Sequence, residues 1–390
     1  MSEILEHAQA LFSYASMLRR DFHRHPEIGF QEVRTAGIVA RELTQLGLEV
    51  TTGIAETGVV ALLEGSQPGP VVLLRFDMDA LPIQEETGAE YASQNPGVMH
   101  ACGHDGHMAV GLTVAKLLAA RRDSLRGTLK FVFQPAEEGL GGAERMVEAG
   151  VLENPQVDRT LALHIWNEKP VGWVGIPAGP LMAGADMFTV RVEGKGGHGA
   201  MPHQAVDPIA AAAQMITALQ TIVSRSLSPL ESAVLSVCQI SAGEAFNVIP
   251  QAAEFRGTIR SFEPHVRSRV VERFNAVIHE TAAAMGCTAS IQLRAITPPV
   301  INDPDAAALV TKAAQEAAPE LAIDPNYRSM VSEDMAFMME KVSGCYFLVG
   351  SGRPEPETSY PHHHPKFDID EAVLPYAAAV MAAAAMEALK

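Results

Sequence analysis

Short, mostly apolar runs alternate with stretches of helical periodicity through the first half of the chain. Such runs are typical of strands that are buried on both faces of a sheet. The predicted strands are 59–63, 71–76, 128–133 and 160–166, and the predicted helices are 3–22, 32–46, 108–121 and 143–149. This alternation predicts an α/β fold in which a mixed, mostly parallel sheet carries helices on both faces.

The alternation of buried strands and helices ends near Ala183 and resumes after Thr297. The intervening segment predicts strands at 186–192, 233–240, 252–259 and 288–293, with helices at 208–223 and 265–285. These elements suffice for an α+β domain of about a hundred residues. We therefore expect a discontinuous first domain over 1–182 and 298–390, and an inserted domain over 183–297. Both boundaries lie beside proline- or glycine-bearing turns, as exposed boundaries do.

Composition and charge narrow the function classes. The formal net charge of −17 argues against nonspecific attraction to nucleic acid or to an anionic membrane. The four cysteines are widely scattered, which is typical of a reduced, cytoplasmic protein rather than a disulfide framework. The amino-terminal residues lack the basic and apolar blocks of a secretory signal, and we expect no membrane span.

The segment 99–107 contains the densest group of metal-capable side chains. Cys102 and His104 lie two residues apart, so an extended loop is expected to point both side chains the same way. A thiolate and an imidazole that converge suit a transition-metal ion. An isolated pair of this kind is more often a buried cysteine beside solvated histidines than a metal site. The metal hypothesis therefore requires further ligands from other segments.

Three further segments supply candidate ligands at the ends of predicted strands, which is the ligand-binding edge of an open α/β sheet. Asp77 follows one strand, the adjacent pair Glu137 and Glu138 follows another, and His164 lies near the end of a third. The histidines 362–364 occur in a long loop near the carboxyl terminus. A paired-metal site needs a bridging ligand, terminal imidazoles and an open position for water. One of two adjacent carboxylates can then bind metal while its neighbour transfers a proton.

Taken in order, these motifs resemble the M20 metallopeptidases, in the amidohydrolase branch of hippurate hydrolases, N-acyl-amino-acid amidohydrolases and indole-acetyl-amino-acid hydrolases. The resemblance covers nearly the whole chain, and the joint order of the motifs is far more specific than any one of them. The matching segments are 25–27, 75–82, 99–107, 134–139, 163–167, 194–203, 246–250 and 363–367.

The resemblance implies a role for each candidate in the first, catalytic domain. The implied metal ligands are Cys102, as the bridge, with His104, Glu138, His164 and His363. Glu137 is implied as the general base and Asp77 as the residue that orients a metal ligand. His363 is selected because the family pattern is His, one residue, then Pro; His362 and His364 are expected to be solvated. Arg75 and Cys102 stand where other M20 branches place a histidine ligand and an aspartate bridge.

The inserted domain resembles the lid and dimerisation domain of the family. His198 and Asn247 look like residues that it supplies, in the same subunit or across a dimer, to stabilise an oxyanion. Arg260 is a candidate to hold a substrate carboxylate, and an ordinary surface ion pair explains it equally well.

The function implied is hydrolysis of the amide bond of an N-acyl amino acid with two divalent metal ions. Zinc or manganese is expected, and cobalt or nickel also suits mixed donor sets. The expected partners are a small-molecule substrate and a second copy of the chain. Two alternatives remain open: an amidase with Cys102 as nucleophile and His104 or His107 as its base, and a non-catalytic metal-binding homologue.

Overall fold

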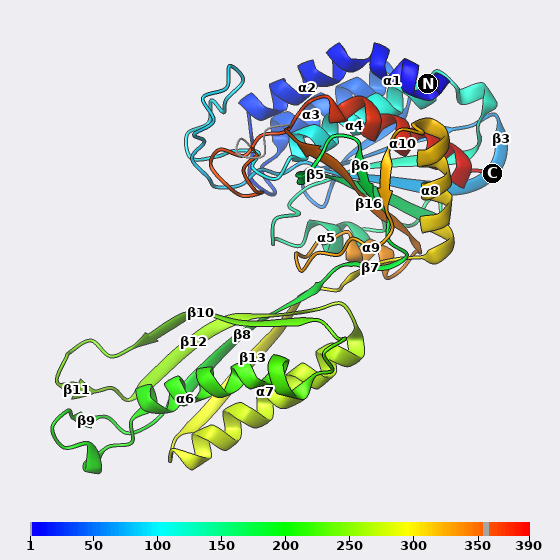
Figure 1. Cartoon of the computed structure of the whole chain (residues 1–390). Helices are drawn as coiled ribbons and strands as arrows, with labels where there is room; N and C mark the ends of the chain where they lie inside the picture. The colour runs from blue at the N-terminus through cyan, green and yellow to red at the C-terminus, as the bar shows by residue number, and fades with distance from the viewer. Residues whose placement is uncertain (1, 354–358) are drawn as a thin grey trace. The chain divides into compact units, whose positions relative to one another are not determined.

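The structure is a computed structural model that describes residues 2–353 and 359–390 (Figure 1). The chain forms two compact units. Unit 1 contains Met1–Leu181, Ile301–Arg328 and Asp334–Lys390, and unit 2 contains Met182–Val300 and Ser329–Glu333. Ser329–Glu333 thus belongs with unit 2, although the sequence analysis assigned that segment to the first domain. Strands β7 (Gly179–Met182) and β14 (Val300–Asn302) pair with each other where the chain passes between the units.

Unit 1 is built on an eight-stranded mixed sheet with the strand order β1-β2-β4-β3-β5-β16-β6-β15. Its central pairs β4-β3, β3-β5 and β5-β16 are parallel, as is β6-β15 at one end, while β1-β2, β2-β4 and β16-β6 are antiparallel. The predicted α/β class is therefore confirmed. The strands are β1 (Glu49–Ile54), β2 (Gly58–Glu64), β3 (Gln67–Asp77), β4 (Arg126–Gln134), β5 (Arg159–Pro170), β6 (Trp173–Gly175), β15 (Ala322–Asp324) and β16 (Gly344–Gly352).

Helices cover both faces of this sheet (Figure 1). Helix α4 packs against α2, α10 and β3 and is buried along almost its whole length. Helices α5 and α9 pack together on the other face. The helices of unit 1 are α1 (Glu3–Ala10), α2 (Phe12–Arg24), α3 (Val33–Gln45), α4 (His104–Ala119), α5 (Gly142–Glu148), α8 (Pro304–Ala317), α9 (Ala336–Met339) and α10 (Val373–Ala388). Among the described residues, no helix combines the length and the apolar character that crossing a membrane requires.

Unit 2 contains a four-stranded antiparallel sheet in the order β10-β12-β8-β13, with α6 and α7 packed on it (Figure 1). Alternate residues of β8 are buried, as expected for a sheet with one covered face. A short ribbon of β9 and β11 extends the unit. The elements are β8 (Gly184–Glu193), β9 (Gly197–His198), α6 (Pro208–Thr221), β10 (Ala233–Ala242), β11 (Val248–Ile249), β12 (Ala252–Ser261), α7 (Pro264–Ala284) and β13 (Thr288–Thr297).

The strand register of unit 1 gathers the candidate side chains at one edge of its sheet. Asp77, the last residue of β3, pairs with Gln134, the last residue of the parallel strand β4. Strand β5 pairs with β3 as far as Arg75 and Ala162, so that His164 lies just beyond the last paired position. Because parallel strands end at a common edge, segments far apart in sequence bring their chemistry together there.

Candidate metal centre

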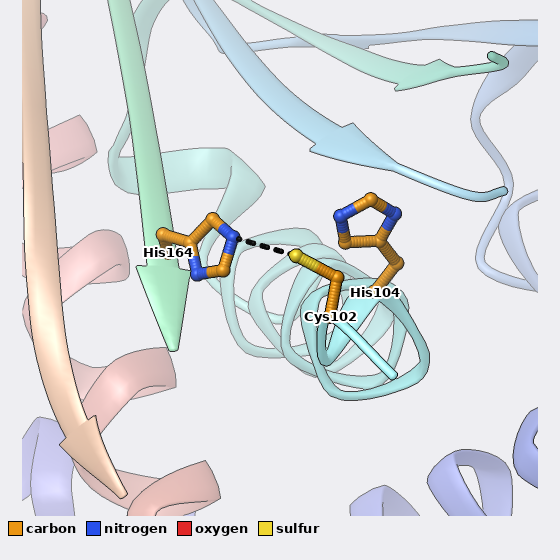
Figure 2. Close-up of side chains that lie close together, drawn as sticks. All are labelled: Cys102, His104 and His164. Atoms are coloured by element: carbon orange, nitrogen blue, oxygen red, sulfur yellow. Dashed lines mark hydrogen bonds between the residues drawn. The ribbon is translucent and has the colours of Figure 1, made fainter. Parts of the chain in front are cut away.

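Cys102 and His104 flank Gly103, the residue just before a helix, rather than lying on an extended loop. Helix α4 begins at His104, and Gly103 before it adopts a left-handed conformation with φ of 89°. The extended-loop interpretation was therefore wrong, since a glycine turn, not strand alternation, directs the two side chains. They nevertheless converge with His164 from β5, and the ligand atoms of the three residues lie within 4.8 Å of one another (Figure 2). Cys102 Sγ is 3.5 Å from His164 Nε2.

A second group of donors includes the same thiol. The ligand atoms of Cys102, Glu138 and His363 also lie within 4.8 Å of one another. His363 Nε2 is 3.2 Å from Glu138 Oε1, and the backbone N–H of His363 donates to the Ala101 carbonyl over 2.8 Å. Cys102 therefore belongs to both groups of donors.

Two of the proposed ligands each have a buried polar atom without a hydrogen-bond partner in the described part of the chain. His104 Nδ1 donates to the Asp79 carbonyl over 2.9 Å, and the buried Nε2 has no hydrogen-bond partner, with Asp77 Oδ2 3.8 Å away. Glu138 Oε1 is also buried without a hydrogen bond. Buried polar atoms rarely lack partners, and a histidine whose other nitrogen is held by a protein acceptor is typical of metal ligation. The donors present therefore fit divalent ions.

The electrostatic surroundings also favour a cation. Burial lowers the pKa of His104, but Asp77, Asp79 and Glu138 outweigh burial and raise that pKa to about 10. Glu137 adds a further carboxylate, and its ligand atom lies within 4.8 Å of those of His104 and Glu138.

The same acidic surroundings disfavour Cys102 as a nucleophile. Burial, followed by the charges of Glu138, Glu137 and Asp77, raises the pKa of the Cys102 thiol well above its usual range. Catalytic cysteines need the opposite environment, which lowers the thiol pKa. A thiolate is favoured here only when a positive ion neutralises the carboxylates, so the cysteine-nucleophile alternative loses support.

Asp77 acts on a histidine that the sequence analysis considered only as a base for Cys102. His107 Nδ1 lies 2.6 Å from Asp77 Oδ1, and the backbone N–H of Ile165 donates to His107 Nε2 over 2.9 Å. Because Nε2 accepts, the proton of the neutral ring is on Nδ1 and is donated to Asp77. This chain of contacts reaches the residue next to His164. The spacing of His104 and His107, three apart on one helix face, was the signal available in the sequence.

Arg75 balances the charge of Asp77. The guanidinium is fully buried and donates from Nη1 to Asp77 Oδ2 over 2.6 Å, from Nη2 to Asp334 Oδ1 over 2.9 Å and from Nε to Gln134 Oε1 over 2.8 Å. Burial alone would raise the pKa of Asp77, but the neighbouring His104, His107 and Arg75 hold it well below its usual range. Asp77 is thus ionised, and its two hydrogen bonds go to Arg75 and His107.

The other histidines of the carboxyl-terminal loop differ from expectation. His362 was expected to be solvated, but its ring packs against Trp166 and Phe367, with centroid separations of 4.8 and 5.0 Å. Its Nε2 lies 3.1 Å from the Ile165 carbonyl, and burial lowers its pKa to about 3. His364 stacks on Tyr360. The packing of His362 depends on Ile165 and Trp166, about two hundred positions away in the sequence, so no local sequence pattern indicates it.

Unit 2 brings His198 and Asn247 together on the β9–β11 ribbon. His198 pairs with Val248, and the Gly199 N–H donates to the Asn247 carbonyl over 2.8 Å. The Ala200 N–H donates to His198 Nδ1 over 3.0 Å, so the neutral ring carries its proton on Nε2. Both residues are exposed, and His198 Nε2–H is available as a hydrogen-bond donor.

Arg260 lies elsewhere in unit 2, on β12. Its guanidinium is half-buried and donates from Nε to Thr258 Oγ1 over 3.2 Å and from Nη1 to Ser332 Oγ over 2.6 Å. Both partners are hydroxyl groups, so the surface ion pair considered from the sequence is not what holds this side chain.

The family model for peptidase family M20/M25/M40 matches residues 73–387. The chain belongs to this family. The resemblance inferred from the motifs is thereby confirmed, and the matched region includes every proposed metal ligand and Glu137.

Relatives of this M20 chain match over most of its length. It is 42% identical over 357 residues to N-acetyl-L-cysteine deacetylase of Bacillus subtilis, covering 92% of this chain and 84% of the relative. It is 48% identical over 285 residues to N-acyl-L-amino acid amidohydrolase of Geobacillus stearothermophilus, covering 73% and 76% of the two chains. A solved structure, the YXEP protein of Bacillus subtilis, described as a dinuclear metal binding peptidase from the M20 family, is 38% identical with a TM-score of 0.85, covering 98% of this chain and 99% of that one.

Proposed function

We propose that this protein is a dinuclear metal-dependent amidohydrolase that cleaves N-acyl amino acids to a carboxylic acid and a free amino acid. Family membership and the activities named for the relatives support this reaction class. The observation that carries the proposal is the pair of donor groups that share Cys102, with Glu137 beside them. A non-catalytic metal-binding homologue has no need of that additional carboxylate.

We infer that five side chains bind the metal pair: Cys102, His104, Glu138, His164 and His363. We call these five residues the ligand set. Cys102 would be the ligand common to both ions, because it alone belongs to both the group with His164 and the group with His363. A thiolate together with imidazoles favours zinc, and a mixed donor set also accepts manganese, cobalt or nickel.

A bound metal pair lowers the pKa of water and polarises the substrate carbonyl. Glu137 accepts the proton of the attacking water and later donates it to the departing amine. The Glu137 carboxylate lies beside His104 and Glu138, close enough to a metal-bound water to exchange a proton with it without being a metal ligand itself. Asp77 keeps His107 in the tautomer that holds the backbone beside His164.

We assign substrate contacts to unit 2, acting as a lid and as the dimerisation domain. His198 Nε2–H is a donor suited to the oxyanion that forms during amide hydrolysis, and Asn247 on the same ribbon is its neighbour. Arg260, held by hydroxyl groups, retains its positive charge for the substrate carboxylate. A homodimer, with His198 supplied in the same subunit or across the interface, completes the proposal.

Glu137→Gln tests the central role. The substitution keeps size and polarity but removes the proton acceptor, so turnover should fall by roughly a hundredfold or more. Metal content, measured by elemental analysis after gel filtration, should remain that of the wild type. Full activity in this variant contradicts the role of Glu137.

Chelation and a substrate panel separate the alternatives. Dialysis against a chelator should abolish hydrolysis, and defined additions of zinc, manganese, cobalt or nickel should restore it. A cysteine amidase keeps its activity after such dialysis. N-acetyl, N-benzoyl and indole-acyl amino acids are assayed for amine release with the reconstituted protein; no release from any of them favours the non-catalytic homologue.

A further inference from the structure

The loop that carries Glu137 and Glu138 begins in an unfavourable backbone conformation. Ala136 adopts a left-handed conformation with φ of 54°, which non-glycine residues rarely adopt and which costs on the order of 1 kcal/mol. This alanine directly precedes the two carboxylates. Some contact must therefore stabilise the loop in this form.

Three carboxylates from distant segments hold the backbone amides of this loop and of the turn after it. The Ala136 N–H donates to Glu32 Oε1 over 2.9 Å, and the Glu138 N–H donates to Asp79 Oδ2 over 3.0 Å. At the start of α5 the Ala143 N–H donates to Asp334 Oδ2 over 2.9 Å. Asp79 lies beside the ligand set and Asp334 pairs with Arg75, whereas the hydrogen bonds of the Glu32 carboxylate within the described residues go to Ala136 and Thr57 and to no proposed metal ligand.

Glu32 is itself fixed in place. The side chain is fully buried, and its second oxygen, Oε2, accepts from the Thr57 hydroxyl over 2.6 Å. Gly29, in the turn before it, packs directly under the loop: a Cβ added there would lie 2.9 Å from the Ala136 Cβ. A rigid, buried acceptor thus faces the amide of the residue whose backbone is strained.

We propose that Glu32 is a positioning residue for Glu137. By accepting the Ala136 N–H it stabilises the left-handed turn that directs the Glu137 carboxylate toward the substrate and the Glu138 carboxylate toward the metal pair. This inference rests on the proposed function, because it takes Glu137 as the general base. It concerns a side chain that neither binds metal nor touches substrate.

The test compares Glu32→Ala with Glu32→Gln. Alanine removes the acceptor, so kcat should fall by roughly ten- to a hundredfold, the size of effect that a displaced catalytic group produces, while KM changes less than about twofold. Glutamine should restore most of the loss, because its amide oxygen can accept from Ala136 while its amide nitrogen donates to the Thr57 hydroxyl. Thr57→Val, which removes only the outer contact, should cause a smaller loss than Glu32→Ala.

A second readout does not depend on activity. In the metal-free protein, amide hydrogen exchange of the segment 136–138 should be faster in Glu32→Ala than in the wild type, and slow again in Glu32→Gln. Asp303→Ala is the control for general destabilisation. Asp303 is the N-terminal cap of α8, and its N–H donates to the carbonyl of Gly344, the first residue of β16. It therefore lies at the end of the strands opposite to the metal centre. Asp303→Ala should lower stability but leave kcat unchanged.

The inference is overturned if Glu32→Ala keeps both the kcat and the amide exchange rates of the wild type. It is also overturned if Asp303→Ala, at an equal loss of unfolding free energy, shows the same loss of kcat. Failure of the proposed function appears separately, as full activity in Glu137→Gln. An inactive Glu137→Gln with a fully active Glu32→Ala leaves the base assignment intact and removes only the positioning role.

Discussion

At the scale of single residues, His107 shows how a hydrogen-bond pattern fixes the chemistry of a side chain. It accepts from a backbone amide on one nitrogen, and so it must donate to Asp77 from the other. The ring is buried, and without it the Ile165 N–H and the Asp77 Oδ1 atom would lose this partner, while Asp77 Oδ2 would keep its bond to Arg75. His107 therefore links the charge pair of Asp77 and Arg75 to the strand that carries His164.

His107→Ala should consequently weaken metal binding without removing a ligand. We expect the metal affinity to fall roughly ten- to a hundredfold, as when the support of a ligand is lost. The free energy of unfolding of the metal-free protein should fall by about 1–3 kcal/mol, because the Ile165 N–H loses its partner. Metal titration and urea unfolding measure the two effects. An unchanged metal affinity would show that His107 acts on stability alone.

Lys130 gives a prediction about pH that is independent of the metal centre. This residue of β4 is 3% exposed, and its ammonium group donates to the Glu153 and Pro155 carbonyls. Burial lowers its pKa from 10.5 to about 8. Between these two values the unfolded chain keeps a proton that the folded chain has lost, so this group makes the free energy of unfolding rise with pH.

Lys130→Met keeps the apolar stem and removes the titration. Urea unfolding at pH 7, 9 and 10.5 measures the free energy of unfolding of both proteins. The value for the wild type minus that for the variant should increase as pH rises through this range. If the free energies of unfolding of the two proteins instead change in parallel with pH, the pKa of Lys130 is not lowered in the folded state.

Residue identities in the sequence were enough to name the M20 family, since paired glutamates after a buried strand and a Cys-x-His before a helix are local patterns. Contacts such as that of Glu32 with Ala136 join segments about a hundred positions apart, and a single sequence contains no trace of them. The packing of His362 on Trp166 was missed for the same reason.

At the scale of elements, the start of α4 differs most from expectation. The sequence predicted a helix from Met108, because the preceding residues are polar and contain two glycines. The structure begins the helix at His104 and buries that polar turn completely. Asp105 is paired there with Arg19 and His23, so tertiary contacts satisfy groups that the local pattern assigns to solvent.

Gly103→Ala tests the helix start. An added Cβ has room, being 3.6 Å from Phe367 Cζ, so the cost comes from the positive φ and should be about 1–2 kcal/mol of stability. Because Cys102 and His104 flank this position, metal affinity should fall as well. Gly47→Ala is the matched control, with φ of 75° and open space around it. Equal metal affinity in the two variants would contradict a role for Gly103 in shaping the site.

Other elements also differ from what the sequence pattern suggests. The helix predicted over 3–22 is divided into α1 and α2 at Leu11, whose N–H bonds to the Ala8 carbonyl in a tighter turn. Helix α9 covers only four residues, and Asp334 just before it directs its carboxylate to Arg75 and Ala143. Strand β1 was not predicted because its residues are mostly exposed polar ones.

At the scale of the whole molecule, the open question is whether His198 serves the site of its own chain. Glu137→Gln and His198→Ala are each expected to be inactive. If His198 acts across a dimer, mixing the two variants under conditions of subunit exchange should restore about a quarter of wild-type activity, since half the dimers are mixed and each has one complete site.

Amine release after mixing measures this complementation, and analytical ultracentrifugation confirms that mixed dimers are present. Activity that stays at the level of the separate variants assigns His198 to its own chain. The sequence could not decide between these outcomes, because the pattern that predicts the two units contains no information about their assembly.

The ligand set also sets the order of events during synthesis of the protein. Its members come from four separate segments, and His363 belongs to the loop just before the final helix. With the metal pair bound by these residues as proposed, the ribosome must deliver nearly the entire polypeptide before both ions can be captured. Metal loading in the cell is then a late maturation step, and a truncated product that lacks the last helices is released without its complete metal complement.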